Sequence, residues 1–138
     1  MDTKTKGKIV SALRRLTFAY KPINDAEKRQ KVDAMLYECE GCSDYVYKGS
    51  SEKNFNKLVD KYPDNTVRRV KKIVRDHKEE VVPIEGFKNG WDWNVFIERM
   101  FCKSEDIQIL CPDCDKLVTD EQKRRRKLVR DTKKTNNA

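Results

Sequence analysis

Apolar residues recur at helical spacing near the start of the chain. In "IVSALRRLTFAY", residues 9–20, arginines occupy one side of the predicted helix. The opposite face collects the apolar side chains of Ile9, Leu13, Leu16 and Tyr20. We expect this helix to end at Lys21 and Pro22, because proline disfavours a continuing helix.

A second helix is predicted in "NDAEKRQKVDAMLY", residues 24–37. Asn24 can cap it, and Glu27 stands three residues later, as in a capping box. Its buried stripe would consist of Val32, Met35 and Leu36. The helix would then lead directly into the first pair of cysteines.

The middle of the chain predicts short elements. In "SDYVYKG", Tyr45 and Tyr47 alternate with smaller or polar residues, which predicts a short strand. Residues 51–66 are polar and predict one short helix around "SEKNFNKLVDKYP". We interpret the region at about 49–66 as an insertion.

The segment "NTVRRVKKIVRDHKEEVVPIEG" is ambiguous. The spacing of Val67, Val70 and Ile73 suits a helix, whereas the β-branched content and the later "VVP" suit strands. We predict a strand at "KIVRDH", residues 72–77.

Two further helices are predicted towards the end of the chain. The first, "WDWNVFIERMF", would bury Trp93, Phe96, Ile97 and Met100. Its aromatic residues could instead stack on bases, but helical spacing is more typical of a core, and we expect Cys102 to pack there too. The second, "TDEQKRRRKLVRDTKK", is a basic helix that frays into a polar tail.

Length and charge limit the function classes. A chain of 138 residues fits one ordinary domain. A net charge of +8 and a pI near 9.3 predict attraction to polyanions, of which nucleic acid is the commonest. The start "MDTKTKGKIV" lacks an apolar signal segment, and no run has the length of a membrane span, so we expect a cytoplasmic protein.

Four of the five cysteines form two CxxC pairs about seventy residues apart: Cys39 with Cys42, and Cys111 with Cys114. Without an export signal, paired cysteines favour metal over disulfide. Four thiolates predict one tetrahedral structural zinc with no open position. The alternatives are two redox dithiols or four unrelated buried cysteines.

The only histidine, His77, follows Asp76 in "VRDHKEE". A lone histidine is more often a satisfied residue than a catalyst, but its surroundings match a pattern. "SALRRL", "CEGC", "DHKEEVVPIEGFKNGWDWNVFIERMFC" and "EDIQILCPDCDKLVTDEQ" resemble, in order, the HNH endonucleases common in bacteriophage genomes. The resemblance covers residues 11 to about 122 and lacks mainly the insertion after Tyr47.

The resemblance implies a ββα-metal fold, in which a two-stranded ribbon and a helix surround one divalent cation, Mg²⁺ or Mn²⁺, beside the zinc knuckles. It implies that His77 is the general base and Asp76 the first cation ligand. Asp115 stands where the last signature histidine, the second ligand, is usual, and Asp106 stands where the signature asparagine is usual.

Both departures have chemical consequences. Mg²⁺ prefers oxygen ligands, so Asp115 can replace a histidine as a ligand. Asp106, when ionised, only accepts hydrogen bonds, whereas asparagine also donates them. A further carboxylate near the cation could also raise the pKa of His77 and weaken it as a base.

The basic residues are candidates for phosphate contacts, which give salt-dependent and largely sequence-independent binding. For any one of them a solvated surface position is the more common role. The candidates are Arg68, Arg69, Lys71, Lys72, Arg75, Lys116, Lys123, Arg124, Arg125, Arg126 and Lys127.

The sequence therefore predicts an α+β protein with a helical segment at 1–38, an HNH-like domain at 39–122 and a basic end at 123–138. The first hypothesis for its function is a metal-dependent endonuclease that hydrolyses phosphodiester bonds in DNA. The second is a catalytically degenerate relative that keeps its zinc and binds nucleic acid or a protein, for example in transcription or packaging.

Overall fold

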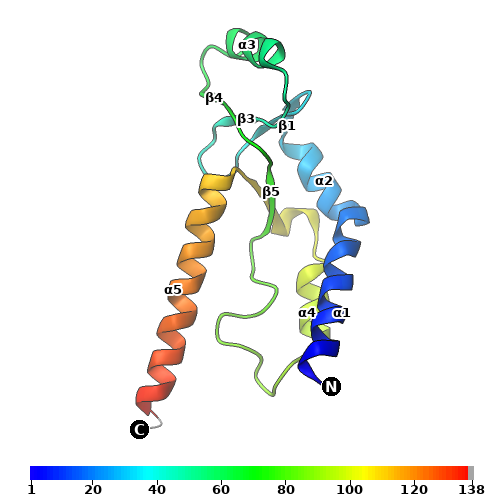
Figure 1. Ribbon diagram of the computed structural model, residues 1–138, viewed down its shortest axis with the longest axis vertical. Helices are drawn as coiled ribbons and strands as arrows, with labels where there is room; N and C mark the ends of the chain where they lie inside the picture. The colour runs from blue at the N-terminus through cyan, green and yellow to red at the C-terminus, as the bar shows by residue number, and fades with distance from the viewer. Residues whose placement is uncertain (137–138) are drawn as a thin grey trace.

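The computed structural model describes residues 1–136 as an α+β fold, which confirms the predicted fold class. One sheet has the strand order β1-β2-β3-β4, and a second pairs β5 with β6. Residues of both sheets share a buried cluster around the cysteines, and the longer helices extend away from it (Figure 1).

The chain begins with α1 (Thr3–Leu16), a 3₁₀ turn η1 (Thr17–Ala19) and α2 (Lys21–Gln30). The first predicted helix is confirmed, but it starts earlier and ends at Leu16. Lys21 and Pro22 begin a helix here and do not end one. Proline fits the first turn because its missing N–H would have no helical partner there.

The prediction of a continuous helix to residue 37 is wrong. The chain turns after Gln30 into β1 (Lys31–Asp33) and β2 (Leu36–Glu38), and Met35 between them has a φ of 60° and is exposed. Leu36 pairs with Tyr47 in β3, and this long-range pairing buries it completely. Burial in a sheet has thus overridden a local helix signal.

The region interpreted as an insertion is the crossover between two parallel neighbours. Strands β3 (Tyr45–Tyr47) and β4 (Val67–Arg69) run parallel, and α3 (Glu52–Lys61), capped by Ser51, connects them. Parallel neighbours require a crossover of about a dozen residues or more. The short strand and the short helix are both confirmed, and α3 lies at one end of the long axis (Figure 1).

The second sheet is an antiparallel ribbon of β5 (Val74–His77) and β6 (Ile107–Leu110). Between them lie α4 (Trp93–Met100) and the 3₁₀ turn η2 (Ser104–Asp106). The strand and the helix are confirmed, and Phe96 and Met100 are buried as expected. Ile97, predicted to be buried, is 41% exposed because it lies on the outer side of α4.

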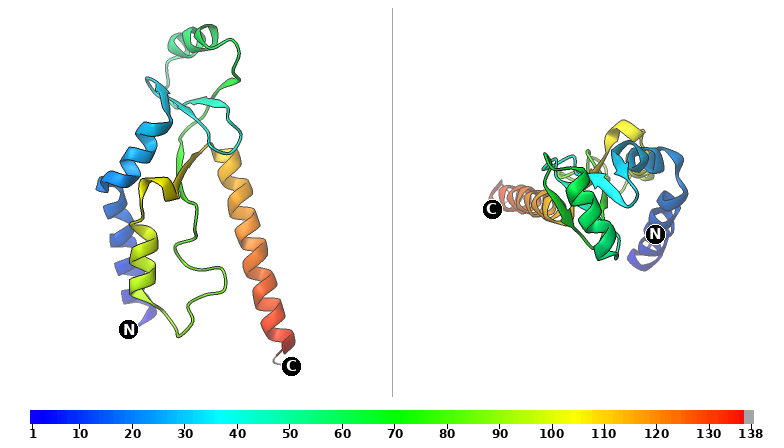
Figure 2. Two further views of the ribbon diagram at one scale, coloured as in Figure 1. Left: turned by 180° about the vertical axis from the view of Figure 1, so that it is seen from behind. Right: turned by 90° about the horizontal axis from the view of Figure 1, so that it is seen from above.

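The last helix, α5 (Pro112–Asn136), starts inside the second cysteine pair, seven residues before the predicted basic helix. It contacts both strands of the ribbon, which completes a strand, strand, helix unit. Both side views place α5 on one side of the loop at 78–92 and α1 with α4 on the other (Figure 2). None of the helices in residues 1–136 has an apolar window long enough to cross a membrane.

Glu27 on α2 connects the helical segment to both sheets. Its carboxylate accepts hydrogen bonds from Arg75 on β5 at 2.7 Å, from Tyr37 on β2 at 3.3 Å and from Lys48 at 3.5 Å. Burial alone would raise the pKa of Glu27, but the bonds to Arg75 and Lys48 hold it below its usual value. The charged form of Glu27 therefore stabilises the fold.

We expect Glu27→Gln to lower the free energy of unfolding by about 1–2 kcal/mol at pH 7, because the substitution leaves the half-buried Arg75 without its counter-charge. The pKa is depressed in the fold, so this contribution is complete above the usual value of 4.5 and is lost as the pH falls through the lower folded value. Urea unfolding at pH 7 and pH 3 measures it. If Glu27→Gln lowered the free energy of unfolding equally at pH 7 and pH 3, the result would contradict a stabilising role of the charged Glu27 carboxylate.

Candidate functional site

Four cysteines from distant parts of the chain form one cluster. Cys39 and Cys42 follow β2, whereas Cys111 follows β6 and Cys114 lies in the first turn of α5. Their four sulfur atoms lie within 4.8 Å of one another. The prediction that the two CxxC pairs meet at one site is confirmed, and the cluster can hold a metal ion.

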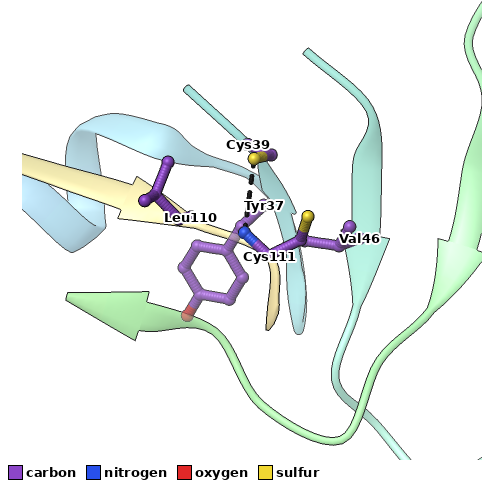
Figure 3. Packing of buried hydrophobic residues seen from close by; sticks show 5 residues of the cluster. All are labelled: Tyr37, Cys39, Val46, Leu110 and Cys111. Carbon is purple, nitrogen blue, oxygen red and sulfur yellow. Dashed lines mark hydrogen bonds between the residues drawn. The ribbon is translucent and has the colours of Figure 1, made fainter. Parts of the chain in front are cut away.

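Backbone N–H groups point at the sulfur atoms. Cys39 Sγ accepts hydrogen bonds from the Cys111 N–H at 3.2 Å (dashed in Figure 3) and from the Gly41 N–H at 3.4 Å. The Cys111 Sγ accepts one from the Cys114 N–H at 3.5 Å. Such bonds stabilise thiolates, which is the form of cysteine that binds metal.

The sulfur spacing fits zinc. Cys42 Sγ and Cys111 Sγ are 4.0 Å apart. Four Zn–S bonds of about 2.3 Å in a tetrahedron place the sulfurs about 3.8 Å apart. Four identical soft ligands leave no position for a substrate, so an ion here is structural.

Gly41 allows the two cysteine pairs to approach closely. A Cβ at this position would lie 2.9 Å from Cys114 Sγ and 3.0 Å from Cys114 Cβ. These distances are shorter than real Cβ contacts, so any side chain here would push the two pairs apart. The sequence "CEGC" thus contains a steric requirement as well as two ligands.

A side chain that sequence reasoning did not assign to the cysteine cluster also contacts its sulfur atoms. The guanidinium of Arg68 donates to Cys111 Sγ at 2.8 Å. Burial alone would raise the pKa of the Cys111 thiol, but the bonds from the Cys114 N–H and from Arg68 bring it down to about 7. By contrast, burial and the neighbouring thiols raise the pKa of Cys114.

The DH pair lies at the end of β5, where Asp76 pairs with Gln108 and His77 with Ile107 of β6. His77 Nε2 lies 2.8 Å from the backbone oxygen of Met100. A carbonyl oxygen only accepts hydrogen bonds, so Nε2 carries the proton, and in the neutral ring Nδ1 has a free lone pair. Nε2 of His77 is therefore engaged with the backbone, which leaves Nδ1 of the neutral ring as its acceptor.

Asp76 is half-buried beside two other carboxylates. Burial raises the pKa of Asp76, a hydrogen bond of 2.7 Å from Gln108 opposes this, and the negative charges of Asp115 and Glu80 raise it further. Asp115 lies in the first turn of α5 and acts on Asp76 through its charge, and its role as a cation ligand stays a prediction. Sequence reasoning missed Glu80, although "HKEE" placed it three residues after His77.

Asp106, the third predicted carboxylate, has different surroundings from Asp76 and Asp115. Its side chain is exposed, lines an open pocket with Glu98 and Cys102, and makes no hydrogen bond within residues 1–136. Its backbone oxygen accepts the Lys78 N–H at 2.9 Å and so extends the ribbon by one pair. The backbone of residue 106 therefore supports the loop after His77, and its side chain does not.

Within residues 1–136, the four cysteines form the only group of three or more possible metal ligands whose ligand atoms lie within 4.8 Å of one another. Asp76, His77 and Asp115 do not form such a group. A Mg²⁺ ion usually keeps several water ligands and takes one or two carboxylates, so a site of Asp76 and Asp115 needs no third protein ligand.

The predicted phosphate contacts divide into two groups by their partners. Most of them are engaged within the fold: Arg68 with Cys111 and Asp44, Arg69 with the Ser50 oxygen, Arg75 with Glu27, Lys116 with Asp120, Arg124 with Glu121, and Arg126 with the Val82 and Pro83 oxygens. Arg125 lies 3.9 Å from Glu80. Within residues 1–136, the exposed Lys71, Lys72, Lys123 and Lys127 have no ion pair.

Comparison with known proteins gives no match: no family model, no curated protein and no solved structure matches the chain. The family resemblance and the roles that it implies therefore stay predictions. The four-cysteine cluster stands on its geometry alone.

We expect one zinc ion per chain, and we expect its removal by a chelator to lower the free energy of unfolding by several kcal/mol. Gly41→Ala should weaken zinc binding about tenfold or more, because the new Cβ separates the two pairs. Metal analysis and chelator competition measure both effects. Gly7→Ala on α1, where a Cβ meets nothing within 4 Å, is the matched control and should leave zinc binding unchanged. Equal zinc affinity in all three proteins would contradict the steric role of Gly41.

Proposed function

We propose that this chain is a metal-dependent endonuclease of the HNH type, which hydrolyses phosphodiester bonds in DNA with Mg²⁺ or Mn²⁺. The observation that supports it most is the state of His77. Its Nε2 is occupied by the Met100 oxygen, and it stands beside Asp76 at the end of a ribbon that α5 contacts.

In this proposal His77 is the general base. Nδ1 takes a proton from a water that is aligned with the scissile phosphate, and the Met100 oxygen stabilises the imidazolium that results. The ring changes charge without changing its orientation, because the bond from Nε2 is kept in both states. A general base in this position contributes about 10²–10⁴-fold to the rate.

Asp76 and Asp115 hold the divalent cation in this proposal. Burial raises the pKa of Asp76, the charges of Asp115 and Glu80 raise it further, and a bound cation would offset all three effects. When bound, the cation supplies charge stabilisation at the phosphate and at the leaving 3′ oxygen. The Gln108 side chain holds one oxygen of Asp76 and leaves the other for this purpose.

DNA is held by phosphate contacts from the unpaired lysines. Lys123 and Lys127 lie two and three turns after Asp115 on α5, roughly 12–18 Å along its axis. This is a distance of about four or five base pairs on a duplex. We place the reaction in a cytoplasm, that of the host if the chain is phage-encoded, where reducing conditions preserve zinc thiolates.

A second candidate is a degenerate HNH fold that acts as a binding module for nucleic acid or a protein. It is favoured by the side chain of Asp106, which is exposed and bonded to nothing where the family has its asparagine. In this case the cysteine centre and the basic surface keep their roles, and the carboxylates hold no cation.

We expect purified protein to cleave supercoiled plasmid with Mg²⁺ or Mn²⁺, and not with EDTA. His77→Ala should lower the rate about 10²–10⁴-fold, and Asp115→Ala should abolish the metal-dependent cleavage. Asp115→His restores the family ligand and should keep activity. Each variant is first checked for its zinc content. If the zinc-loaded wild-type protein shows no cleavage with either Mg²⁺ or Mn²⁺, the result favours the second candidate instead.

Binding to DNA should depend on salt under the first candidate, and also under the second where its ligand is nucleic acid. Changing Lys123 and Lys127 together to Gln should reduce the slope of log affinity against log salt by about 2, because each phosphate contact contributes roughly 0.9. Lys53 and Lys57 on α3 are equally exposed and serve as the charge-matched control pair. Fluorescence anisotropy at several salt concentrations measures this. Equal slopes for both pairs would contradict a binding surface on α5.

A further inference from the structure

Arg68 has more polar partners than any exposed arginine of α5. Its Nη2 donates to Cys111 Sγ at 2.8 Å, and it lies 3.6 Å from Cys42 Sγ. Its Nε donates to Asp44 at 2.9 Å and its Nη1 to Asp113 at 3.2 Å. The side chain is 29% exposed, so these contacts form in a partly desolvated place.

The charge of the cysteine centre requires a counter-charge. Four thiolates around one divalent ion carry a net charge of −2, and the carboxylates of Asp44 and Asp113 lie on the same side. Among the residues that the structure describes, Arg68 is the only cationic side chain with a hydrogen bond to a sulfur. It bonds one sulfur from each CxxC pair.

We infer that Arg68 is a positioning residue of the metal centre, which neutralises its charge and bridges its two cysteine pairs. Planar guanidinium suits this role because one group can donate to two sulfurs and two carboxylates in fixed directions. Such outer contacts commonly change metal affinity by about 10–100-fold. The inference depends on a metal at the cysteines and not on nuclease activity.

The helical crossover explains how Arg68 reaches the sulfurs. The return of the chain through α3 allows β4 to pair in parallel with β3, and the register sets Arg68 opposite Val46. Val46 belongs to the buried cluster that contains Cys39 and Cys111. The segment 49–66 therefore positions a residue of the metal centre.

The neighbouring Arg69 points the other way. It donates to the Ser50 oxygen at 3.1 Å, and its guanidinium lies 5.7 Å from the centre of the Phe55 ring. Successive residues of a strand face opposite sides, so a shift of one residue in β4 would exchange the two arginines. Arg69 thus has the same charge on the same strand without contact to sulfur, which makes it the matched control.

The inference predicts the order of zinc affinities in a chelator competition without DNA. Arg68→Gln should bind zinc about 10–100-fold more weakly than wild type, and Arg68→Lys should recover part of the loss, because it keeps the charge and loses the planar fork. Arg69→Gln should match wild type. Cobalt-loaded Arg68→Gln should also show its sulfur-to-metal charge-transfer band at longer wavelength, because a lost hydrogen bond destabilises the sulfur lone pairs.

Two results would overturn the inference. One is wild-type zinc affinity and an unshifted cobalt band in Arg68→Gln. The other is an equal loss of affinity in Arg69→Gln, which would mean that any positive charge on β4 has the same effect. If Arg68→Gln does not fold, Asp44→Asn replaces it: this variant keeps Arg68 and removes the charge of the carboxylate that it bonds at the shortest distance. It should weaken zinc binding several-fold and shift the band slightly, and no change in either would refute the role.

Discussion

The meeting of four cysteine sulfurs is the constraint on which the rest of the structure depends. Cys39 and Cys42 belong to the end of the four-stranded sheet, whereas Cys111 and Cys114 join the ribbon to α5. The buried cluster around them includes Val46 from one sheet and Leu110 from the other. The chain is small and its hydrophobic core is divided into separate clusters, so the cysteine centre is an important link between the two sheets.

The same centre also positions the proposed catalytic groups. Asp115 directly follows Cys114, so the cysteine that fixes the start of α5 also fixes the carboxylate. The ribbon brings Asp76 and His77 to it through the pairing of β5 with β6. A metal at the cysteines would thus fix the start of α5 and with it Asp115, so its loss would also disturb the proposed catalytic groups.

Charge is distributed unequally over the fold. The acidic group of Asp76, Asp115 and Glu80 lies beside a strongly basic helix, and Arg125 approaches Glu80 at 3.9 Å. The arginines near the sheets are engaged with Glu27, Asp44 or cysteine sulfur, whereas Lys71, Lys72, Lys123 and Lys127 stay exposed. This division follows from chemistry, because the planar guanidinium suits several fixed partners and the ammonium of lysine stays hydrated.

The sequence by itself determined the local features: the CxxC spacing, the helical periods of α1, α3 and α4, the strand at β5 and the basic charge of α5. These features depend on residues close together in the chain, so their pattern was sufficient. Only the tertiary structure decided that Leu36 leaves a helix for a sheet and that Arg68 contacts the sulfurs. Each of these involves partners that are distant in the sequence or on separate elements, and no local pattern encodes which of them will meet.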